Sequence, residues 1–360
     1  MLRERHGGDH QQWNEAAPWG VRRPMQPIAR LGFVLPLALA FACKSPPAPQ
    51  AEAAKEAKAA EPAENAESTP TPAPTIEDQP TTGVHWQQLA DAALASADEP
   101  GALVILDATS GKVLAKSERE GRVPHPLESA RHPASSIKPF VYLAALAEGH
   151  LEDGETFPCT GPKRYGEHEL ECFQDHGDVD LERAVRTSCN HFAYALADRF
   201  TLEQLNGHLA TFGFGDSPGH VPTEKGMAEA VGHGDMTATP LQIARAYARL
   251  ARGFTGDDSP YRPEDLERVR KALATTVSHR EGTAHGLHMD GLGIAGKTGT
   301  ATLEPSDEDD AKYLSIFASW APAEDPEIVV VVQLESTEAG GKAAEALRPV
   351  YEALRATLDD

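Results

Sequence analysis

The sequence is short of basic residues. It has 33 lysines and arginines against 55 aspartates and glutamates among its 360 residues, which gives a formal net charge of −22 at pH 7. A protein that binds the phosphate backbone of nucleic acids, or docks on an anionic membrane, usually does so through a basic face. The shortage of basic residues argues against both, and we expect no nucleic acid among the partners.

Long apolar runs are also missing. The one run that resembles a membrane segment is residues 31–42 (LGFVLPLALAFA), and its twelve residues are too few to cross about 30 Å of hydrocarbon as a helix. Arginines precede the run, as in a secretory signal. Residues 39–43 (LAFAC) resemble the bacterial lipoprotein cleavage box, which implies an exported protein anchored to the membrane by a lipid on Cys43. An ordinary cleaved signal and an uncleaved anchor are the alternatives.

Branched aliphatic residues are nearly missing from residues 44–80. This stretch of 37 residues contains 10 Ala, 8 Pro and 6 Glu, with Ile76 as its one branched aliphatic residue. Such a composition cannot bury enough apolar surface to offset the entropy lost on ordering. Residues 1–24 would make an unusually long polar leader, so we expect translation to start at Met25. The sequence thus predicts a leader at 1–43, a disordered tether at 44–82 and one folded domain at 83–360.

The folded part alternates between strand and helix patterns. Two apolar runs flank a turn cluster at 102–115, which predicts a β-hairpin. Helical spacing of apolar residues predicts helices at 140–147, 181–185, 192–196 and 241–250. Near the end of the chain the sequence predicts strands at 293–302, 313–320 and 328–334, and an amphipathic helix at 342–358. We expect an antiparallel sheet built from both ends of the domain, with a helical region between them.

Ser135 and Lys138 form the first candidate chemical motif. They are three residues apart at the start of a helical pattern, which places them on one face, one turn apart. A serine hydroxyl needs a base to become a nucleophile, and a lysine can act as that base where burial or a second cation lowers its pKa. This spacing is common in helices, so an exposed helix start is the simpler interpretation of the motif alone.

Two further motifs follow along the chain. Residues 188–190 (SCN) lie between two helical segments, where hydrogen bonding within a loop is the simpler interpretation. Residues 297–300 (KTGT) lie within a predicted strand. Gly299 there would let a ligand backbone approach, and an exposed strand edge can accept an extended peptide as an additional strand.

In this order, the three motifs resemble the S-x-x-K, S-x-N and K-T-G set of serine enzymes that recognise penicillin. Four other segments extend the resemblance: GALVILDATSGKVLA at 101–115, HGDVDL at 176–181, GHG at 232–234 with TPLQ at 239–242, and GTA at 282–284. Over roughly residues 100–358 the chain resembles the transpeptidase domain of penicillin-binding proteins. The resemblance implies an α/β fold of the α+β type, with a five-stranded antiparallel sheet flanked by helices and an all-helical subdomain.

The resemblance implies acyl transfer on peptidoglycan. Ser135 would attack the carbonyl between two D-alanines of a stem peptide, with Lys138 as general base, and Ser188 would pass the proton to the leaving amine. An amine would then accept the acyl group to form a cross-link, or water would accept it in trimming. A β-lactam would acylate Ser135 and leave slowly. Cell-wall synthesis proteins are expected partners, beside the stem peptides, the β-lactams and the membrane.

The same resemblance assigns the remaining site residues. Asn190 would hold the donor backbone and help orient the general base, and Lys297 would keep nearby pKa values low. Thr298 and Thr300 would bind the terminal carboxylate of the peptide, with Gly299 between them in the substrate-binding strand. The backbone N–H groups of the nucleophile and of Thr300 would form the oxyanion hole.

The chain departs from the family pattern at two motif positions and in length. Ala134 stands where the family usually has Gly, and His233 where it usually has Gln. The segment before Ser135 is short, and we expect neither a glycosyltransferase domain nor a pedestal domain. The alternatives are therefore a D,D-carboxypeptidase or a catalytically idle penicillin-binding sensor or scaffold. A β-lactamase is less favoured, because the nearest string to its E-x-x-L-N loop, at 203–206, has the wrong spacing.

Three cysteines lie within the folded part. Cys159 and Cys172 could pair as a disulfide in an exported protein. Zinc is the alternative, with His168 and His176 nearby, but no C-x-x-C or H-x-x-x-H spacing supports it. Cys189 is most simply a small buried filler. From the sequence we expect no metal and no cofactor.

Overall fold

The computed structural model describes residues 84–358 except 162, 166–167, 171, 217–218, 220–227, 255–258, 304–312 and 338–340. The expected leader and tether, with Met25 and Cys43, lie outside the described residues. All the described residues belong to one unit of the chain, Ala73–Asp360. Among them, no helix combines the length and the hydropathy that a membrane span requires.

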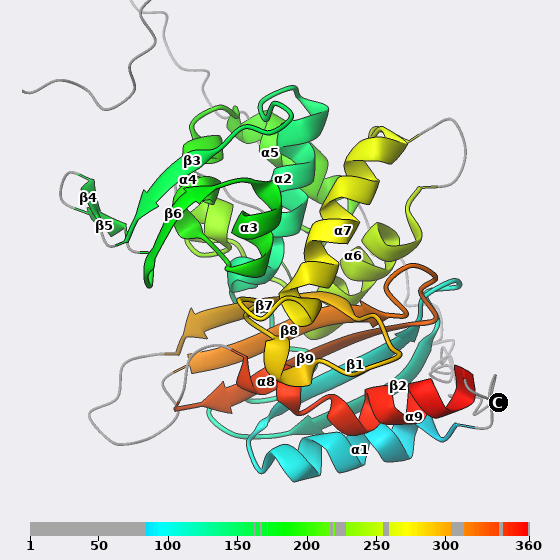
Figure 1. The fold of residues 1–360 in the computed structure, drawn as a ribbon. Helices are drawn as coiled ribbons and strands as arrows, with labels where there is room; N and C mark the ends of the chain where they lie inside the picture. Colours follow the sequence, from blue (N-terminus) through cyan, green and yellow to red (C-terminus); the bar gives the residue numbers. More distant parts are fainter. Residues whose placement is uncertain are drawn as a thin grey trace, which may run out of the picture. The chain divides into compact units, whose positions relative to one another are not determined.

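A five-stranded antiparallel sheet forms one layer of the domain (Figure 1). In spatial order its strands are β2 (Val113–Arg119), β1 (Gly101–Asp107), β9 (Ile328–Ser336), β8 (Tyr313–Ala321) and β7 (Ala295–Thr302). The first two strands of the domain thus pair with the last three, as the sequence predicts. The central strand β9 is buried along its whole length, because both faces of the sheet are covered.

The two faces of the sheet belong to different hydrophobic clusters. In β1, Leu103 and Ile105 pack with the terminal helices, whereas Val104 and Leu106 pack with the helical lobe. Alternation of this kind follows from the two-residue period of a strand. The terminal helices are α1 (Trp86–Ala97), α8 (Lys342–Glu345) and α9 (Arg348–Leu358).

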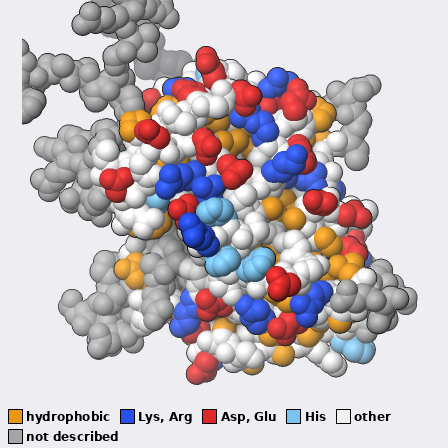
Figure 2. Space-filling model, viewed as in Figure 1, with side chains coloured by type: hydrophobic (Ala, Val, Ile, Leu, Met, Phe, Trp, Pro, Cys, Tyr) orange, Lys and Arg blue, Asp and Glu red, His pale blue; other side chains and the backbone are white. Residues whose placement is uncertain are grey.

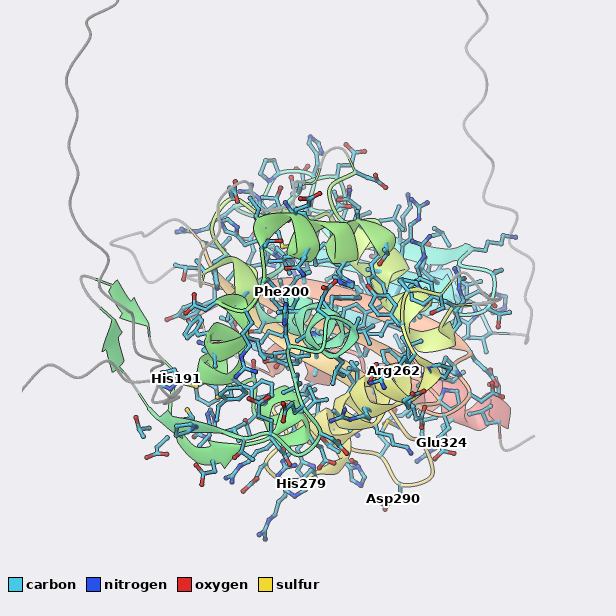
Figure 3. The ribbon with its side chains drawn as sticks, turned by 90° about the horizontal axis from the view of Figure 1, so that it is seen from above. His191, Phe200, Arg262, His279, Asp290 and Glu324 are labelled. Carbon is cyan, nitrogen blue, oxygen red and sulfur yellow. The ribbon has the colours of Figure 1, made fainter. Side chains whose placement is uncertain are left out.

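The opposite face of the sheet carries the helical lobe, which lies above it in Figure 1. The lobe contains α2 (Lys138–Ala147), α3 (Leu181–Arg186), α4 (Asn190–Ala197), α5 (Leu202–Thr211), α6 (Pro240–Arg252) and α7 (Pro263–Ser278). It also contains the 3₁₀ helices η1 (Ala134–Ile137) and η2 (Glu229–Val231), and η3 (His285–Leu287) follows α7. Viewed from above, His191 of α4 and Arg262 before α7 mark opposite sides of the lobe (Figure 3).

The lobe is not helical throughout. Two small antiparallel pairs extend from it, β3 (Phe157–Thr160) with β6 (Asp175–Val179), and β4 (Lys163–Tyr165) with β5 (His168–Leu170). The sequence predicts no strands there. These strands are three to five residues long, too short for a periodic pattern to distinguish them from a loop.

Two of the motif segments begin helices. Thr239 caps α6 in a capping box with Gln242, and Pro240 occupies the first turn, where its missing N–H costs nothing. Asp180 caps α3 and accepts a hydrogen bond from the Arg183 N–H over 2.8 Å. Substituting such a cap by alanine typically costs about 1 kcal/mol. These motif residues therefore have a structural task of their own.

The predicted terminal helix is two helices. α8 ends at Glu345 and α9 begins at Arg348, immediately before Pro349. Proline cannot donate the backbone hydrogen bond of a helix interior, but it is well placed in a first turn. The sequence predicts neither α1 nor α7, although both are regular helices. Residues 203–206 do lie in a helical pattern, and they belong to α5.

The surface mixes charges of both signs. Figure 2 shows acidic and basic side chains interspersed over one face of the domain, with histidines among them. On this face the acidic surplus of the sequence does not gather into a single patch.

Candidate active site

A cavity of about 450 Å³ lies against β7, η1 and the helical lobe. All three sequence motifs contribute to its lining, together with residues that the motifs do not contain. The lining residues are Ser135, Phe173, Ser188, Asn190, Tyr194, Val231, His233, Thr283, Thr298, Gly299, Thr300 and Gly341. Segments more than 200 residues apart in the chain therefore meet in one pocket.

Ser135 and Lys138 differ in their exposure. Ser135 belongs to η1 and is half-buried at the pocket, whereas Lys138 is the first residue of α2 and is fully buried. The Lys138 ammonium donates hydrogen bonds to the Ser188 carbonyl over 2.8 Å and to Asn190 Oδ1 over 2.5 Å. Burial lowers the pKa of Lys138 to about 8. The neutral amine that a general base requires is therefore accessible near physiological pH.

Lys297 is the second buried lysine of the site. Its Nζ donates hydrogen bonds to Ser188 Oγ over 2.7 Å and to the Thr298 carbonyl over 2.9 Å. Burial, and then the charge of Lys138, lower the pKa of Lys297 well below its usual value. Ser188 thus connects the two lysines, because its carbonyl accepts from one of them and its hydroxyl accepts from the other.

Ser188 adopts a left-handed backbone conformation, with φ at 55°. A residue other than glycine in this region costs about 1–3 kcal/mol, so its surroundings must hold it there. The N–H of Ser188 donates to the Val185 carbonyl over 3.2 Å, and the next N–H, of Cys189, donates to the Ala184 carbonyl over 3.0 Å. These bonds tie the strained residue to the end of α3.

The K-T-G strand β7 is the edge strand of the sheet, as an added peptide strand would require. The approach of a ligand is one expected reason for a glycine at position 299, but this glycine also allows close packing within the protein. A Cβ there would lie 3.2 Å from the Pro133 carbonyl and 3.2 Å from the Ser136 amide nitrogen. Gly299 therefore lets β7 pack closely against the turn that carries Ser135.

Gly232 supports the same turn from the other side. Ala134, directly before Ser135, has a left-handed φ of 48°, and its N–H donates to the Gly232 carbonyl over 3.0 Å. A Cβ on Gly232, whose φ is 78°, would lie 2.2 Å from the Ala134 carbonyl oxygen. Only glycine fits at this position, which accounts physically for the first glycine of the GHG segment.

Several pocket residues lie outside the predicted set. Phe173 is 63 % exposed at the pocket, and Tyr194 of α4 also lines it. Thr283 Oγ1 lies 2.7 Å from Thr298 Oγ1, so the GTA segment contacts the K-T-G strand. Burial, followed by the neighbouring His132, lowers the pKa of His233. The resemblance could have indicated Thr283 and His233, but no pattern around Phe173 indicates that it faces a pocket.

The three cysteines of the folded part lie together behind the pocket, beside His176. One ligand atom from each of Cys159, Cys172, His176 and Cys189 lies within 4.8 Å of all the others, and the four residues are buried. The three cysteines are free, so the possible pairing of Cys159 with Cys172 is not formed in this structure. The side chain of His168 lies outside the described part of the chain. These four residues are the group that could hold a metal ion.

Residues 101–352 match the family model of the penicillin binding protein transpeptidase domain, which is well over half of the chain. The chain belongs to this family. Membership confirms the resemblance drawn from the motifs, and the observed sheet with its helical lobe confirms the predicted fold class. The S-x-x-K, S-x-N and K-T-G motifs of this penicillin-binding protein domain all contribute residues to its pocket, and their two buried lysines donate hydrogen bonds to Ser188 of the pocket.

Named relatives fit this membership. The chain is 28% identical over 286 residues to the peptidoglycan D,D-transpeptidase MrdA of Acinetobacter baumannii, covering 61% of this chain and 42% of the relative. It is 26% identical over 304 residues to the peptidoglycan D,D-transpeptidase FtsI of Escherichia coli K12, covering 73% of this chain and 51% of the relative. The chain thus spans about half or less of the length of these relatives.

A solved structure shares the fold. A complex between penicillin-binding protein PBP2 and MreC from Helicobacter pylori matches with a TM-score of 0.65 and 21% identity. The match covers 74% of this chain and 62% of that one. At this identity the likeness concerns the fold alone.

Proposed function

We propose that the chain is a serine D,D-transpeptidase that acts on D-Ala-D-Ala stem peptides of peptidoglycan and is acylated by penicillin at Ser135. The observation that carries this proposal is the position of Ser188 between Lys138 and Lys297 at the edge of one pocket. Family membership and the relatives named as peptidoglycan D,D-transpeptidases support it.

The first step forms an acyl-enzyme. Neutral Lys138 takes the proton of Ser135 as Oγ bonds to the carbonyl carbon of the penultimate D-alanine, and the carbonyl electron pair moves onto its oxygen. The backbone N–H groups of Ser135 and Thr300 stabilise this oxyanion, and such a donor is typically worth about 10²–10³ in rate. When the electron pair returns to the carbonyl, the carbon–nitrogen bond breaks and the terminal D-alanine leaves. The proton that Lys138 took from Ser135 passes through Ser188 to the leaving nitrogen, so Lys138 is neutral again.

The substrate lies along the edge strand β7 in this proposal. Thr298 and Thr300 bind the terminal carboxylate, and Asn190 holds the peptide backbone while it keeps its contact with Lys138. In the second step an amine of a neighbouring stem peptide attacks the ester carbonyl, and neutral Lys138 takes the proton that the amine loses. As the ester bond breaks, Lys138 gives this proton to Ser135 Oγ and frees the serine. If water attacks the ester carbonyl instead of the amine, the acyl-enzyme is hydrolysed and the stem peptide is trimmed.

Three alternatives use the same pocket. A D,D-carboxypeptidase or a β-lactamase would perform the first step and then favour water. A sensor or scaffold would bind penicillin without turnover. The presence of both buried lysines and both site serines favours an enzyme, because a binding module does not need a base, a proton relay and a nucleophile together.

A labelling experiment tests the nucleophile. Wild-type protein and the Ser135→Ala variant are incubated with a fluorescent penicillin, and we expect a covalent label on the wild type alone. An unlabelled wild type, or a labelled variant, would remove Ser135 from its role. Incubation with a stem pentapeptide, with and without an amine acceptor, then separates the activities. Hydrolysis alone in the presence of the amine would replace the transpeptidase by a carboxypeptidase.

We also propose where the domain works. Export with a lipid on Cys43 and a tether at 44–82 would place the domain on the periplasmic or cell-wall side of a membrane. Cell-wall synthesis proteins are then its expected partners; the penicillin-binding protein PBP2 of Helicobacter pylori, which has a similar fold, is seen in a complex with MreC. Metabolic labelling with a fatty acid, compared between wild type and Cys43→Ala, tests the anchor: equal label in both would reject it.

A further inference from the structure

We propose that Cys159, Cys172, His176 and Cys189 form a zinc site, and that this site holds the Ser188–Asn190 segment in its active geometry. The four donors come from four places in the lobe. They lie on β3, in the segment before β6, on β6 and at the residue that precedes α4. The fold therefore assembles the cluster. Its member Cys189 lies two residues before His191, which Figure 3 labels.

The spacing of the donors suits a tetrahedral metal. Cys159 Sγ and Cys172 Sγ lie 3.4 and 3.3 Å from His176 Nδ1, and all four donor atoms lie within 4.8 Å of one another. With Zn–S near 2.3 Å and Zn–N near 2.0–2.1 Å, the donors of a tetrahedral site are about 3.5–3.8 Å apart. The cluster needs shifts of less than about 1 Å to take that geometry.

The chemistry of the donors selects zinc. Three thiolates and one imidazole are a common set in structural zinc sites, and soft sulfur ligands do not suit magnesium or calcium. The three cysteines are fully buried and His176 is 3 % exposed, so the site is closed, as structural zinc sites are. The backbone N–H of Asn190 donates to Cys172 Sγ over 3.4 Å, a supporting contact of the kind that orients metal ligands.

A disulfide, or buried free thiols that only fill space, would explain the positions of these four residues less completely than a metal ion does. A disulfide between Cys159 and Cys172 would use two of the donors and leave Cys189 and His176 without a task. Buried thiols alone would offer the His176 ring only weak hydrogen-bond partners. A metal ion engages all four residues at once, and its binding replaces up to three thiol protons by one divalent ion.

The position of Cys189 links the metal to the active site. Cys189 lies between Ser188 and Asn190, which both accept hydrogen bonds from Lys138. Ser188 is held in a left-handed conformation, so a fixed ligand at the next residue would keep it there. The ring of Phe173, at the pocket, also lies 5.1 Å from the ring of His176. The metal would thus position two pocket segments without touching the substrate.

Metal content tests the site directly and does not depend on the proposed function. The full chain is purified as wild type, as Cys159→Ser and as Cys43→Ser, a control that removes a cysteine outside the cluster. After exposure to zinc and dialysis, we expect about one zinc per chain in the wild type and in the control, and less than about a tenth of that in Cys159→Ser. When cobalt replaces zinc, the visible spectrum of a tetrahedral thiolate site should appear in the wild type and in Cys43→Ser, but not in Cys159→Ser.

Acylation by a fluorescent penicillin tests the coupling, which rests on the proposed function. We expect the rate to fall about 10–100-fold in Cys159→Ser and in wild type treated with a chelator, because supporting contacts at metal sites have effects of this size. Added zinc should restore the acylation rate of the chelator-treated wild type, but not that of Cys159→Ser. Stripping the wild type also keeps the test decisive if Cys159→Ser does not fold.

The contrary outcomes are distinct. Wild-type protein that takes up no zinc would overturn the site. Wild-type protein that shows two fewer free thiols after denaturation without a reductant than after reduction would also overturn it, in favour of a disulfide. If the wild type takes up zinc but its acylation rate does not change when the zinc is removed, the zinc site has no role in positioning the active site. Failure of wild-type protein to react with penicillin would instead reject the proposed function, and the zinc content would still decide the site.

Discussion

Lys297 Nζ donates a hydrogen bond to Ser188 Oγ over 2.7 Å, and both side chains are buried. The carbonyl of the same serine accepts a hydrogen bond from Lys138. Two ammonium groups in one buried region oppose each other, and burial disfavours the charge on each. The arrangement therefore favours a neutral amine on one of them, which is the state that the proposed general base needs.

The rate of acylation should rise with pH until Lys138 has lost its proton. Burial lowers the pKa of Lys138 to about 8. The base acts in its neutral form, so below this pKa the rate should fall by about tenfold per pH unit, and above it the rate should level off. Stopped-flow acylation between about pH 6 and 9, with the thermal midpoint followed in parallel, measures this. A flat profile in a protein that stays folded would exclude Lys138 as the titrating base.

Replacing Lys297 by methionine should separate activity from stability. Lys297→Met removes the donor to Ser188 Oγ and a buried charge, and keeps a side chain of similar length. We expect acylation to fall by about 10²–10⁴-fold, the usual share of a positioned proton-transfer group. The free energy of unfolding should stay unchanged or rise, because a buried charge is costly. Matched denaturation and acylation series check both parts.

The control for this prediction is Lys271→Met. Lys271 lies on α7, is exposed and pairs with Glu267 over 3.3 Å, so its loss should change neither quantity by more than about 0.5 kcal/mol. If Lys297→Met acylates at the wild-type rate, Lys297 has no part in the chemistry. If it unfolds well below the wild type, a structural role explains the loss.

Elements with a strong local pattern were predicted correctly from the sequence. The strands at both ends of the domain pair into one sheet because β1, β8 and β9 consist mostly of apolar residues, which both faces of the sheet bury. Helices α2 and α6 combine apolar spacing with proline in the first turn. The order of the three motifs, together with four further matching segments, indicated the family. The three motifs must meet in one pocket whatever the loops between them do.

Other features depend on tertiary contacts that no local pattern encodes. Cys172 and His176 are four residues apart, but Cys159 and Cys189 join them only because β3 pairs with β6 and α4 begins beside that pair. The sequence therefore favoured a filler for Cys189. Phe173 is similar: its exposure at the pocket depends on the path of the segment before β6.

Two glycine substitutions should differ because of one contact. Gly232 and Gly149 both have left-handed backbones, with φ of 78° and 67°. A Cβ at Gly149 meets nothing within 4 Å, whereas at Gly232 it would lie 2.2 Å from the Ala134 carbonyl oxygen. We expect Gly149→Ala to cost about 1–2 kcal/mol of strain, and Gly232→Ala to cost more and also slow acylation at Ser135. Equal costs, measured by urea unfolding, would mean that the turn before Ser135 adapts easily.

Truncating Phe173 should weaken the capture of bulky apolar ligands without destabilising the domain. Phe173 is 63 % exposed and lines the pocket, so its ring covers little of the core and is free to cover a ligand. If a ligand buries about 50 Å² of this ring, at about 25 cal/mol per Å² the loss is near 1.2 kcal/mol, or about 8-fold. Phe173→Ala should therefore lower the second-order acylation constant about 3–10-fold for penicillins with an aromatic side chain.

The comparison that isolates this contact uses a second exposed apolar residue. Leu358, at the end of α9, is 42 % exposed and does not line the pocket, so Leu358→Ala should change neither acylation nor the thermal midpoint. For Phe173→Ala the midpoint should stay within about 2 °C of the wild type, because the ring is mostly in solvent. A penicillin without an aromatic group should lose less rate than one with it. Equal losses for both compounds would mean that Phe173 shapes the pocket instead of contacting the ligand.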